Sequence, residues 1–249
     1  MDLGLNDRVA IITGSARGIG AETARMLAKE GASVVVTDLD LDAADENVRA
    51  IEAAGGKAIA VACDVRKEEQ VKQLAGAALE AFGRIDVLVN NAGLVKDRTI
   101  LKMEEADWDL VLDVTLKGAF HTTRAVLPSM HERGWGRIIN ISSRALFGNP
   151  GQANYSTAKA GIIGFTRAMS LEQARKGVTV NAIAPGYIET EYIKSLPNYE
   201  TILANVMAKN AVTFPGQTSD IAGAVCFMAS EHARYITGTT LFVTGGRYG

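Results

Sequence analysis

A tyrosine and a lysine four positions apart, Tyr155 and Lys159, are the side chains in this sequence best suited to proton transfer. Residues i and i+4 of a helix lie on one face, so the phenol and the ammonium can approach each other. A phenol with a pKa of about 10 is a poor acid–base catalyst at neutral pH. An adjacent positive charge favours the phenolate and lowers that pKa. An ordinary surface pair on a helix has the same pattern. The elements around Tyr155 and Lys159 must therefore show whether the pair is catalytic.

A glycine-rich segment, residues 13–20, joins a short apolar run to a helical stretch. Glycines permit a tight turn and a close approach of the backbone to a phosphate group. The helix that follows offers free N–H groups and the positive end of its dipole to the same anion. We therefore expect a nucleotide pyrophosphate to bind here. The residues expected to hold it are Gly14, Ser15, Arg17, Gly18, Ile19 and Gly20.

Two side chains near this turn give opposite indications of the cofactor. Asp38 ends the second apolar run, where a carboxylate accepts hydrogen bonds from the adenosine ribose hydroxyls and repels a 2′-phosphate. Arg17, inside the turn, is a guanidinium that could instead pair with a 2′-phosphate. We give more weight to Asp38. The repulsion between its carboxylate and a 2′-phosphate is expected to exceed the attraction that an exposed, mobile arginine provides. The expected cofactor is NAD, with NADP as the alternative.

Strands and helices alternate along most of the chain. The expected strands are continuous apolar runs, which is typical of a parallel sheet buried on both faces. Single helices between them predict right-handed crossovers. The sequence thus predicts one doubly wound, Rossmann-type α/β domain over residues 1–249, with a sheet of about seven strands and helices on both faces. The expected strands are 9–12, 33–37, 58–62, 85–89, 137–141, 178–183 and 240–243; the expected helices are 18–29, 42–54, 68–82, 108–130 and 153–176.

Residues 187–215, here called the lid segment, interrupt this alternation. A long irregular insertion in a compact domain is often a functional lid, although an ordinary packed connection has the same appearance. Aromatic residues in and near the segment favour a partly apolar substrate pocket over simple core packing. They are Phe147, Tyr187, Tyr192 and Tyr199.

Composition excludes several other kinds of protein. The formal net charge of -2 gives no general attraction to nucleic acids or anionic membranes. The chain begins without a signal peptide and contains no apolar run long enough to span a membrane, so we expect a cytoplasmic protein. Cys63 and Cys226 are expected to be reduced thiols. His121, His131 and His232 have no metal-binding spacing, so no metal site is predicted.

Taken together, these residues resemble the short-chain dehydrogenases/reductases over nearly the whole chain. The resemblance implies that Asp64 and Val65 contact the adenine, that Asn91, Ala92 and Gly93 line the adenosine ribose, and that the segment around residue 186 holds the nicotinamide. Homotetramers built through the two long helices after the fourth and fifth strands are also implied by this resemblance. The matching positions are the turn at 13–20, Asp64 with Val65, Asn90 with Asn91, Ala92 and Gly93, Tyr155 with Lys159, and Pro185 with Gly186, Ile188 and Thr190.

The resemblance also implies the catalytic roles. Tyr155 would take the alcohol proton as hydride leaves for the nicotinamide, and Lys159 would bind the nicotinamide ribose and lower the tyrosine pKa. A serine at the end of the fifth strand would hydrogen-bond the substrate oxygen. Counting back from Tyr155 by the usual spacing selects Ser142, whereas counting along the strand from Gly136 selects Ser143. We favour Ser143, because a one-residue slip would turn every strand side chain to the other face.

Thr115 stands where the family usually has an asparagine that distorts its helix and frees a carbonyl for a relay water. We expect an active enzyme with an altered relay, since the threonine hydroxyl can bond back to the preceding turn. A non-catalytic nucleotide sensor on the same fold is the alternative from another class of protein. Intact Tyr155 and Lys159 argue against it.

The expected activity is NAD-dependent interconversion of a secondary alcohol and a ketone of medium size, partly apolar and including aromatic alcohols. The closest competitor is a 3-oxoacyl thioester reductase, because residues 151–155 resemble the 3-oxoacyl-carrier-protein reductases. Those enzymes usually prefer NADPH, which Asp38 disfavours.

Overall fold

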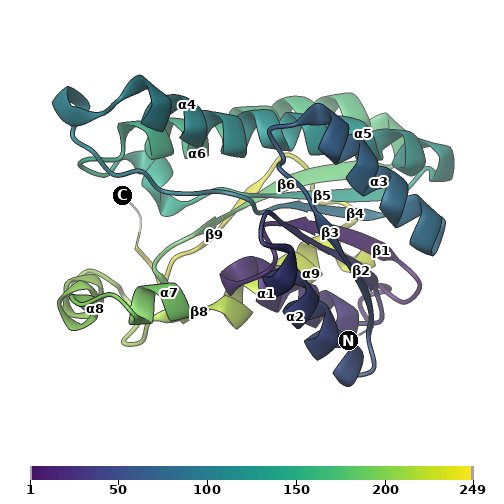
Figure 1. Cartoon of the computed structure of the whole chain (residues 1–249), viewed down its shortest axis with the longest axis horizontal. Coiled ribbons are helices and arrows are strands. Elements are labelled where there is room, and N and C mark those ends of the chain that lie inside the picture. Colours follow the sequence, from purple (N-terminus) through teal and green to yellow (C-terminus); the bar gives the residue numbers. More distant parts are fainter. Residues whose placement is uncertain (1, 248–249) are drawn as a thin grey trace.

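A parallel β-sheet forms the centre of the molecule in this computed structural model, which describes residues 2–247 (Figure 1). Within the described residues the sheet has seven strands in the order β3-β2-β1-β4-β5-β6-β9. The predicted doubly wound α/β fold is therefore confirmed. The strands are β1 (Val9–Thr13), β2 (Ser33–Asp38), β3 (Lys57–Ala62), β4 (Val87–Asn90), β5 (Gly136–Ile141), β6 (Val178–Pro185) and β9 (Thr240–Val243).

Helices cover both faces of the sheet (Figure 1). One face carries α1 (Gly18–Lys29), α2 (Leu41–Ala53) and α9 (Thr218–Ala229); the other carries α3 (Glu68–Phe82), α4 (Glu105–Leu112), α5 (Gly118–Arg133) and α6 (Ala153–Gln173). Each central strand is consequently buried on both sides, and β1, β4, β5 and β6 are buried along their whole length. This is why their sequences are continuously apolar rather than alternating.

Strand β4 begins later than the expected 85–89. The backbone N–H of Ile85 donates to the hydroxyl of Ser129 on α5 at 3.1 Å. The next residue, Asp86, is fully buried and accepts from Arg84 and from the backbone N–H of Val9. The backbone of Asp86 also bonds the carbonyl of Val9 and the N–H of Arg137, both at 2.9 Å. The paired residues of β1 and β4 begin at Ala10 and Val87.

The expected helix at 108–130 is interrupted. A π-helical segment, Asp113–Lys117, lies between α4 and α5, and the N–H of Gly118 donates to the carbonyl of Asp113, five residues earlier. A single π turn inside an α-helix is rare and is often found at functional sites. Its position next to α6 puts it close to the helix that carries Tyr155.

Helix α9 had no counterpart among the expected elements. A capping box formed by Gln217 and Asp220 starts it, and its face with Ile221 and Val225 is fully buried. The helix packs on α1. Because the segment is nearly uniformly apolar, it lacks the periodic contrast by which an amphipathic helix is recognised.

The lid segment contains β7 (Ile188–Glu189), α7 (Glu191–Lys194) and α8 (Tyr199–Met207). Strand β7 pairs in parallel with β8 (Gly216–Gln217), which closes the segment at its base. Both helices lie to one side of the main sheet (Figure 1). Short 3-10 turns at Ile100–Lys102, Arg144–Phe147, Ala174–Lys176 and Glu231–Ala233 complete the described structure.

Among residues 2–247, no helix is long and apolar enough to cross a membrane. The same range holds no group of three or more His, Cys, Asp or Glu side chains that could ligate a metal ion. Cys63 and Cys226 are buried free thiols, and burial raises the pKa of Cys63 to about 11 and that of Cys226 to about 12.

Candidate active site

The turn between β1 and α1 has the geometry needed to bind a phosphate. Gly14 and Gly18 have positive φ angles of 62° and 60°, which favour glycine. A Cβ on Gly20 would lie 2.3 Å from the carbonyl oxygen of Gly14, so the turn could not close around a larger residue. No side chain caps the first turn of α1. Its free N–H groups therefore suit the pyrophosphate of a dinucleotide.

Asn91 fixes this turn to the end of β4. Its side-chain amide donates to the carbonyls of Thr13 and Gly14 at 2.9 and 2.8 Å. The hydroxyl of Thr13 accepts from the backbone N–H groups of Asn91 and Ala92, both at 3.0 Å. The segment after β4 and the glycine turn are thus one hydrogen-bonded unit.

A cavity of about 310 Å³, here called the nucleotide cavity, opens beside this unit. Asp38 lies at its edge, and one carboxylate oxygen accepts from the N–H of Ala16 at 3.2 Å. Asp64 is held by Arg66 through hydrogen bonds of 2.6 to 3.1 Å, which lower the pKa of Asp64. The predicted residues that line this cavity are Gly14, Arg17, Asp38, Asp64, Val65, Asn91, Ala92 and Gly93.

Arg17 has an acidic partner that the sequence did not reveal. Its guanidinium forms an ion pair of 2.9 Å with Asp40, and 74% of its side chain is exposed. An exposed pair of this kind contributes little to stability. It does, however, neutralise the positive charge that would attract a 2′-phosphate.

A second cavity of about 520 Å³, here called the catalytic cavity, lies at the ends of β4, β5 and β6. A Cβ on Gly186 would be 2.8 Å from the Cα of Thr244, so glycine is required for this wall to pack. The predicted residues that line it are Gly14, Arg17, Ile19, Gly20, Asn91, Gly93, Ser143, Tyr155, Lys159, Pro185, Gly186, Ile188 and Thr190.

Two predicted cofactor residues lie outside both cavities. Ser15 is fully buried, and its N–H and hydroxyl are used within the protein, bonding Thr37 and the carbonyl of Ile12. The side chain of Ser15 is thus occupied within the protein, and the prediction that Ser15 binds the cofactor stays a prediction. Gly18 lines a neighbouring cavity on the outer side of the turn.

The two candidate serines differ in their hydrogen bonds. Both line the catalytic cavity. The hydroxyl of Ser142 donates to the backbone carbonyl of Lys159 at 2.7 Å. The hydroxyl of Ser143, in contrast, accepts from the backbone N–H of Ala145 at 3.1 Å and lies close enough to the phenol of Tyr155 to oppose the rise in its pKa. The geometry favours Ser143 as the serine that can share a substrate oxygen with the tyrosine.

Lys159 is buried below this pair, with 3% of its surface exposed. Its Nζ donates to the carbonyl of Ile141 at 2.7 Å and lies 5.5 Å from the centre of the Tyr155 ring. Burial lowers the pKa of Lys159 to about 8. The same cause raises the pKa of Tyr155, an effect that the bond from Ser143 opposes and the charge of Asp97 reinforces. The net shift of the tyrosine is upward, opposite to the direction expected from a neighbouring lysine.

Thr115 lies in the π-helical segment, so the helix is distorted here without an asparagine. Its hydroxyl is buried and makes no hydrogen bond within the described residues. The expected bond back to the preceding turn is therefore absent. The wider π turn has moved the backbone carbonyls away from the positions in which an α-helical threonine would reach them.

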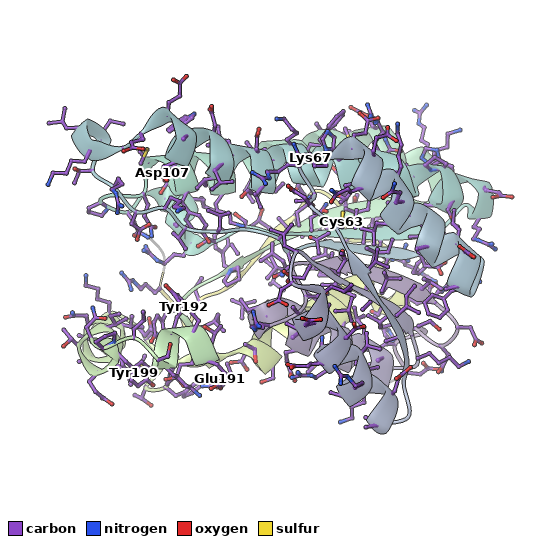
Figure 2. The ribbon with its side chains drawn as sticks, viewed as in Figure 1. Cys63, Lys67, Asp107, Glu191, Tyr192 and Tyr199 are labelled. Atoms are coloured by element: carbon purple, nitrogen blue, oxygen red, sulfur yellow. The ribbon has the colours of Figure 1, made fainter. Side chains whose placement is uncertain are left out.

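The four aromatic residues proposed to line a substrate pocket do not act as a group. Tyr187 lines the catalytic cavity, and its hydroxyl is buried without a partner among the described residues. Phe147 stacks on Phe242. Tyr192, on α7, is largely exposed, and Tyr199, on α8, donates a short hydrogen bond to Glu189 (Figure 2).

Asn149 and Gln152 also line the catalytic cavity and were not singled out in advance. Both lie near the start of α6, in a loop whose path cannot be deduced from hydrophobic periodicity. Their proximity to Tyr155 in the sequence was the only signal that could have identified them.

Comparisons with known proteins show what the chain is similar to. Residues 14–247 match the family model described as "Enoyl-(Acyl carrier protein) reductase". A 3-oxoacyl-[acyl-carrier-protein] reductase of Synechocystis is 48% identical, over 97% of this chain and 97% of its own length. The (2S)-[(R)-hydroxy(phenyl)methyl]succinyl-CoA dehydrogenase subunit BbsD of Thauera aromatica is 41% identical, over 98% of each chain. A crystal structure from Burkholderia xenovorans, described as a short-chain dehydrogenase/reductase, has 35% identity and a TM-score of 0.92 over 97% of each chain.

The fold and the two cavities, together with these relatives, define a nicotinamide-dependent oxidoreductase that acts on CH–OH groups. The chain belongs to the short-chain dehydrogenase/reductase family. Membership in a family of oxidoreductases favours an enzyme over a non-catalytic nucleotide sensor.

Proposed function

We propose that this enzyme interconverts a secondary alcohol and a ketone with NAD, acting on a substrate of medium size that is partly apolar and can be aromatic. The observation that carries the proposal is that Ser143, Tyr155 and the buried Lys159 line one cavity of about 520 Å³. The Nζ of Lys159 lies 5.5 Å from the centre of the Tyr155 ring.

Each of these side chains has a distinct role in the proposal. Ser143 holds the substrate oxygen, and Tyr155 accepts its proton during oxidation or donates one during reduction. Lys159 keeps a titratable group next to the tyrosine, and its anchoring to Ile141 fixes where that group lies. When bound, the nicotinamide supplies or accepts the hydride. The glycine turn and Asn91 bind the rest of the dinucleotide, and Thr190 holds its carboxamide end.

NAD rather than NADP is the cofactor in this proposal. Asp38 presents a carboxylate to the nucleotide cavity, where it suits two ribose hydroxyls and disfavours a phosphate. Arg17 is already paired with Asp40. Asp40 thus partly neutralises the positive charge of Arg17, which a 2′-phosphate would need for binding.

A second candidate is an NADPH-dependent 3-oxoacyl thioester reductase. The name of the Synechocystis relative, 3-oxoacyl-[acyl-carrier-protein] reductase, favours it. The name of the Thauera relative, (2S)-[(R)-hydroxy(phenyl)methyl]succinyl-CoA dehydrogenase subunit BbsD, combines a CoA thioester with an aromatic alcohol. Both activities require the same chemistry at Tyr155, so they differ in the group attached to the ketone and in the cofactor.

The deciding experiment is a panel of aliphatic ketones, aromatic ketones and acetoacetyl thioesters, each assayed with NADH and NADPH. The proposal expects the highest kcat/KM for a free ketone with NADH. A higher value for a thioester with NADPH would support the second candidate. Tyr155→Phe should lower either activity by a factor of about 10² or more, and hydride transfer that persists in this variant would contradict both.

We also propose that the lid segment covers the catalytic cavity. Tyr187 and Ile188 at its start line that cavity, and the bond from Tyr199 to Glu189 ties α8 to β7, the strand that begins at Ile188. Protection of the segment from limited proteolysis by saturating NAD would support this role. Equal cleavage rates with and without NAD would argue against it.

A homotetramer is a further part of the proposal. Phe120 on α5 and Leu171 on α6 expose apolar surface along the two long helices expected to form the interface. Light scattering of the purified protein should give four times the chain mass of 26.4 kDa. Phe120→Glu should then reduce the assembly to dimers or monomers.

A further inference from the structure

Arg144, the residue after Ser143, is a buried arginine without an acidic partner. Only 8% of its surface is exposed, and no carboxylate lies within 4.0 Å of its guanidinium in residues 2–247. Burying a charge without an opposite charge is costly, so such residues usually have a functional reason. Burial itself lowers the pKa of Arg144, and the positive charge of nearby Arg247 lowers it further.

Arg144 lies behind the wall of the catalytic cavity and is connected to it through Asn149. Its Nη2 donates to the side-chain oxygen of Asn149 at 2.5 Å. The amide of Asn149 then donates to Gln152 at 2.9 Å. Asn149 and Gln152 line the same cavity as Ser143 and Tyr155. The guanidinium makes no other hydrogen bond with the described residues, so its remaining N–H groups are available.

Charges around this wall do not cancel. Arg247 lies close enough to affect Arg144 and forms no ion pair with residues 2–247. The acidic group on the same rim is Asp97, whose two oxygens accept from Gln152 at 3.1 Å. Asp97 is exposed, so water screens its charge more than that of the buried arginine. The region behind Asn149 therefore has a local surplus of positive charge.

We propose that Arg144 recognises a carboxylate carried by the substrate. The inference rests on the proposed alcohol–ketone chemistry and adds that the reacting molecule is an anion. A guanidinium binds a carboxylate through paired, charge-assisted hydrogen bonds. Because so little of Arg144 is exposed, the carboxylate would be largely withdrawn from water, where such a pair is strong. Asn149 holds the guanidinium in place from inside the cavity wall.

Matched ketones test the proposal: phenyl ketones whose alkyl chain ends in a carboxylate, against the same ketones ending in a primary amide, with two to four methylenes between the groups. For at least one chain length, the wild-type enzyme should prefer the acid in kcat/KM by about tenfold or more. Arg144→Gln should remove that preference, and Arg144→Lys should retain part of it. Arg175→Gln, an exposed arginine in a 3-10 turn after α6, is the matched control and should leave the ratio unchanged.

Equal rates for acid and amide at every chain length would overturn the proposal, as would a preference that survives in Arg144→Gln. A binding measurement separates this outcome from failure of the proposed function. The calorimetric affinity of the NAD-loaded enzyme for phenylalkanoates, which cannot react, should fall about tenfold or more in Arg144→Gln. Absence of turnover with retained, Arg144-dependent binding would contradict only the alcohol–ketone activity. Turnover without a charge preference would contradict only the role of Arg144.

Discussion

The hydroxyl of Ser142 donates to the backbone carbonyl of Lys159 at 2.7 Å and so joins the end of β5 to the middle of α6. Ser143, one residue further, is the serine whose hydroxyl reaches Tyr155. Adjacent residues with the same side chain thus have different tasks, one structural and one facing the substrate oxygen.

Substitution of each serine should separate these tasks. Ser143→Ala is expected to lower kcat/KM by about 10² to 10³, because it removes a hydrogen bond to the developing charge on the substrate oxygen. Ser142→Ala should instead lower the free energy of unfolding by about 1 to 2 kcal/mol, with a smaller change in kcat. Steady-state kinetics and urea unfolding of both variants measure the two effects. A larger kinetic defect in Ser142→Ala would reverse the assignment.

Lys159 should make stability depend on pH in the alkaline range. Burial lowers its pKa from 10.5 to about 8, so between these values the unfolded chain binds more protons than the folded one. Stability contributed by this group therefore rises with pH from about 8 to 10.5, by at most about 3 kcal/mol. Urea unfolding of the wild type and of Lys159→Met across this range isolates the contribution, because the buried cysteines and Tyr155 titrate in both proteins. A difference between them that does not change with pH would contradict the burial of an ionisable lysine.

Thr115→Val is expected to leave the protein equally stable or to stabilise it by about 1 kcal/mol, since it removes a buried hydroxyl that has no partner. Thr122→Val is the matched control on the same helical run. Its hydroxyl donates to Asn90 at 2.6 Å and lies within 2.9 Å of the Gly118 carbonyl, so this variant should lose about 1 to 2 kcal/mol. Thermal unfolding compares them. A drop in kcat for Thr115→Val at unchanged stability would show that the hydroxyl takes part in proton transfer.

Cofactor choice should depend on Asp38, which ends β2, and on Asp40, two residues later. Asp38→Ala is expected to reduce the preference for NADH over NADPH by about tenfold or more, because the repulsion of a 2′-phosphate is lost. Asp40→Ala should raise kcat/KM for NADPH by a different mechanism, because it releases Arg17 from its ion pair. The ratio of kcat/KM values for the two cofactors is the measurement. A preference for NADPH already present in the wild type would contradict the assignment of NAD.

The sequence predicted the sheet and the catalytic pair because both depend on local patterns. Continuous apolar runs identify buried parallel strands, and the spacing of Tyr155 and Lys159 is enough to place both on one helical face. Helix α9 was not predicted, because its residues are apolar on nearly every side and the periodic contrast between apolar and polar positions is absent.

Other features depend on contacts between distant segments. Ser15 looked like a cofactor ligand, yet the approach of β2 uses its N–H and hydroxyl. The partner of Arg17 depends on the path of the chain after Asp38, and the isolation of Arg144 depends on a 3-10 turn. The pKa of Tyr155 is raised chiefly by burial, and Lys159, whose Nζ bonds the carbonyl of Ile141, is not among the groups that shift it.

Thr190 is part of both the catalytic cavity and the start of helix α7. It lines the catalytic cavity, and its hydroxyl accepts from the N–H of Ile193 to begin helix α7. Any displacement of α7 must carry Thr190 with it, whereas the glycine turn and Asn91 stay on the sheet. Dissociation of the dinucleotide would then occur from one end, with the reactive ring freed before the phosphates. Mutations in α7 should accordingly alter residence time more than the preference among nucleotides.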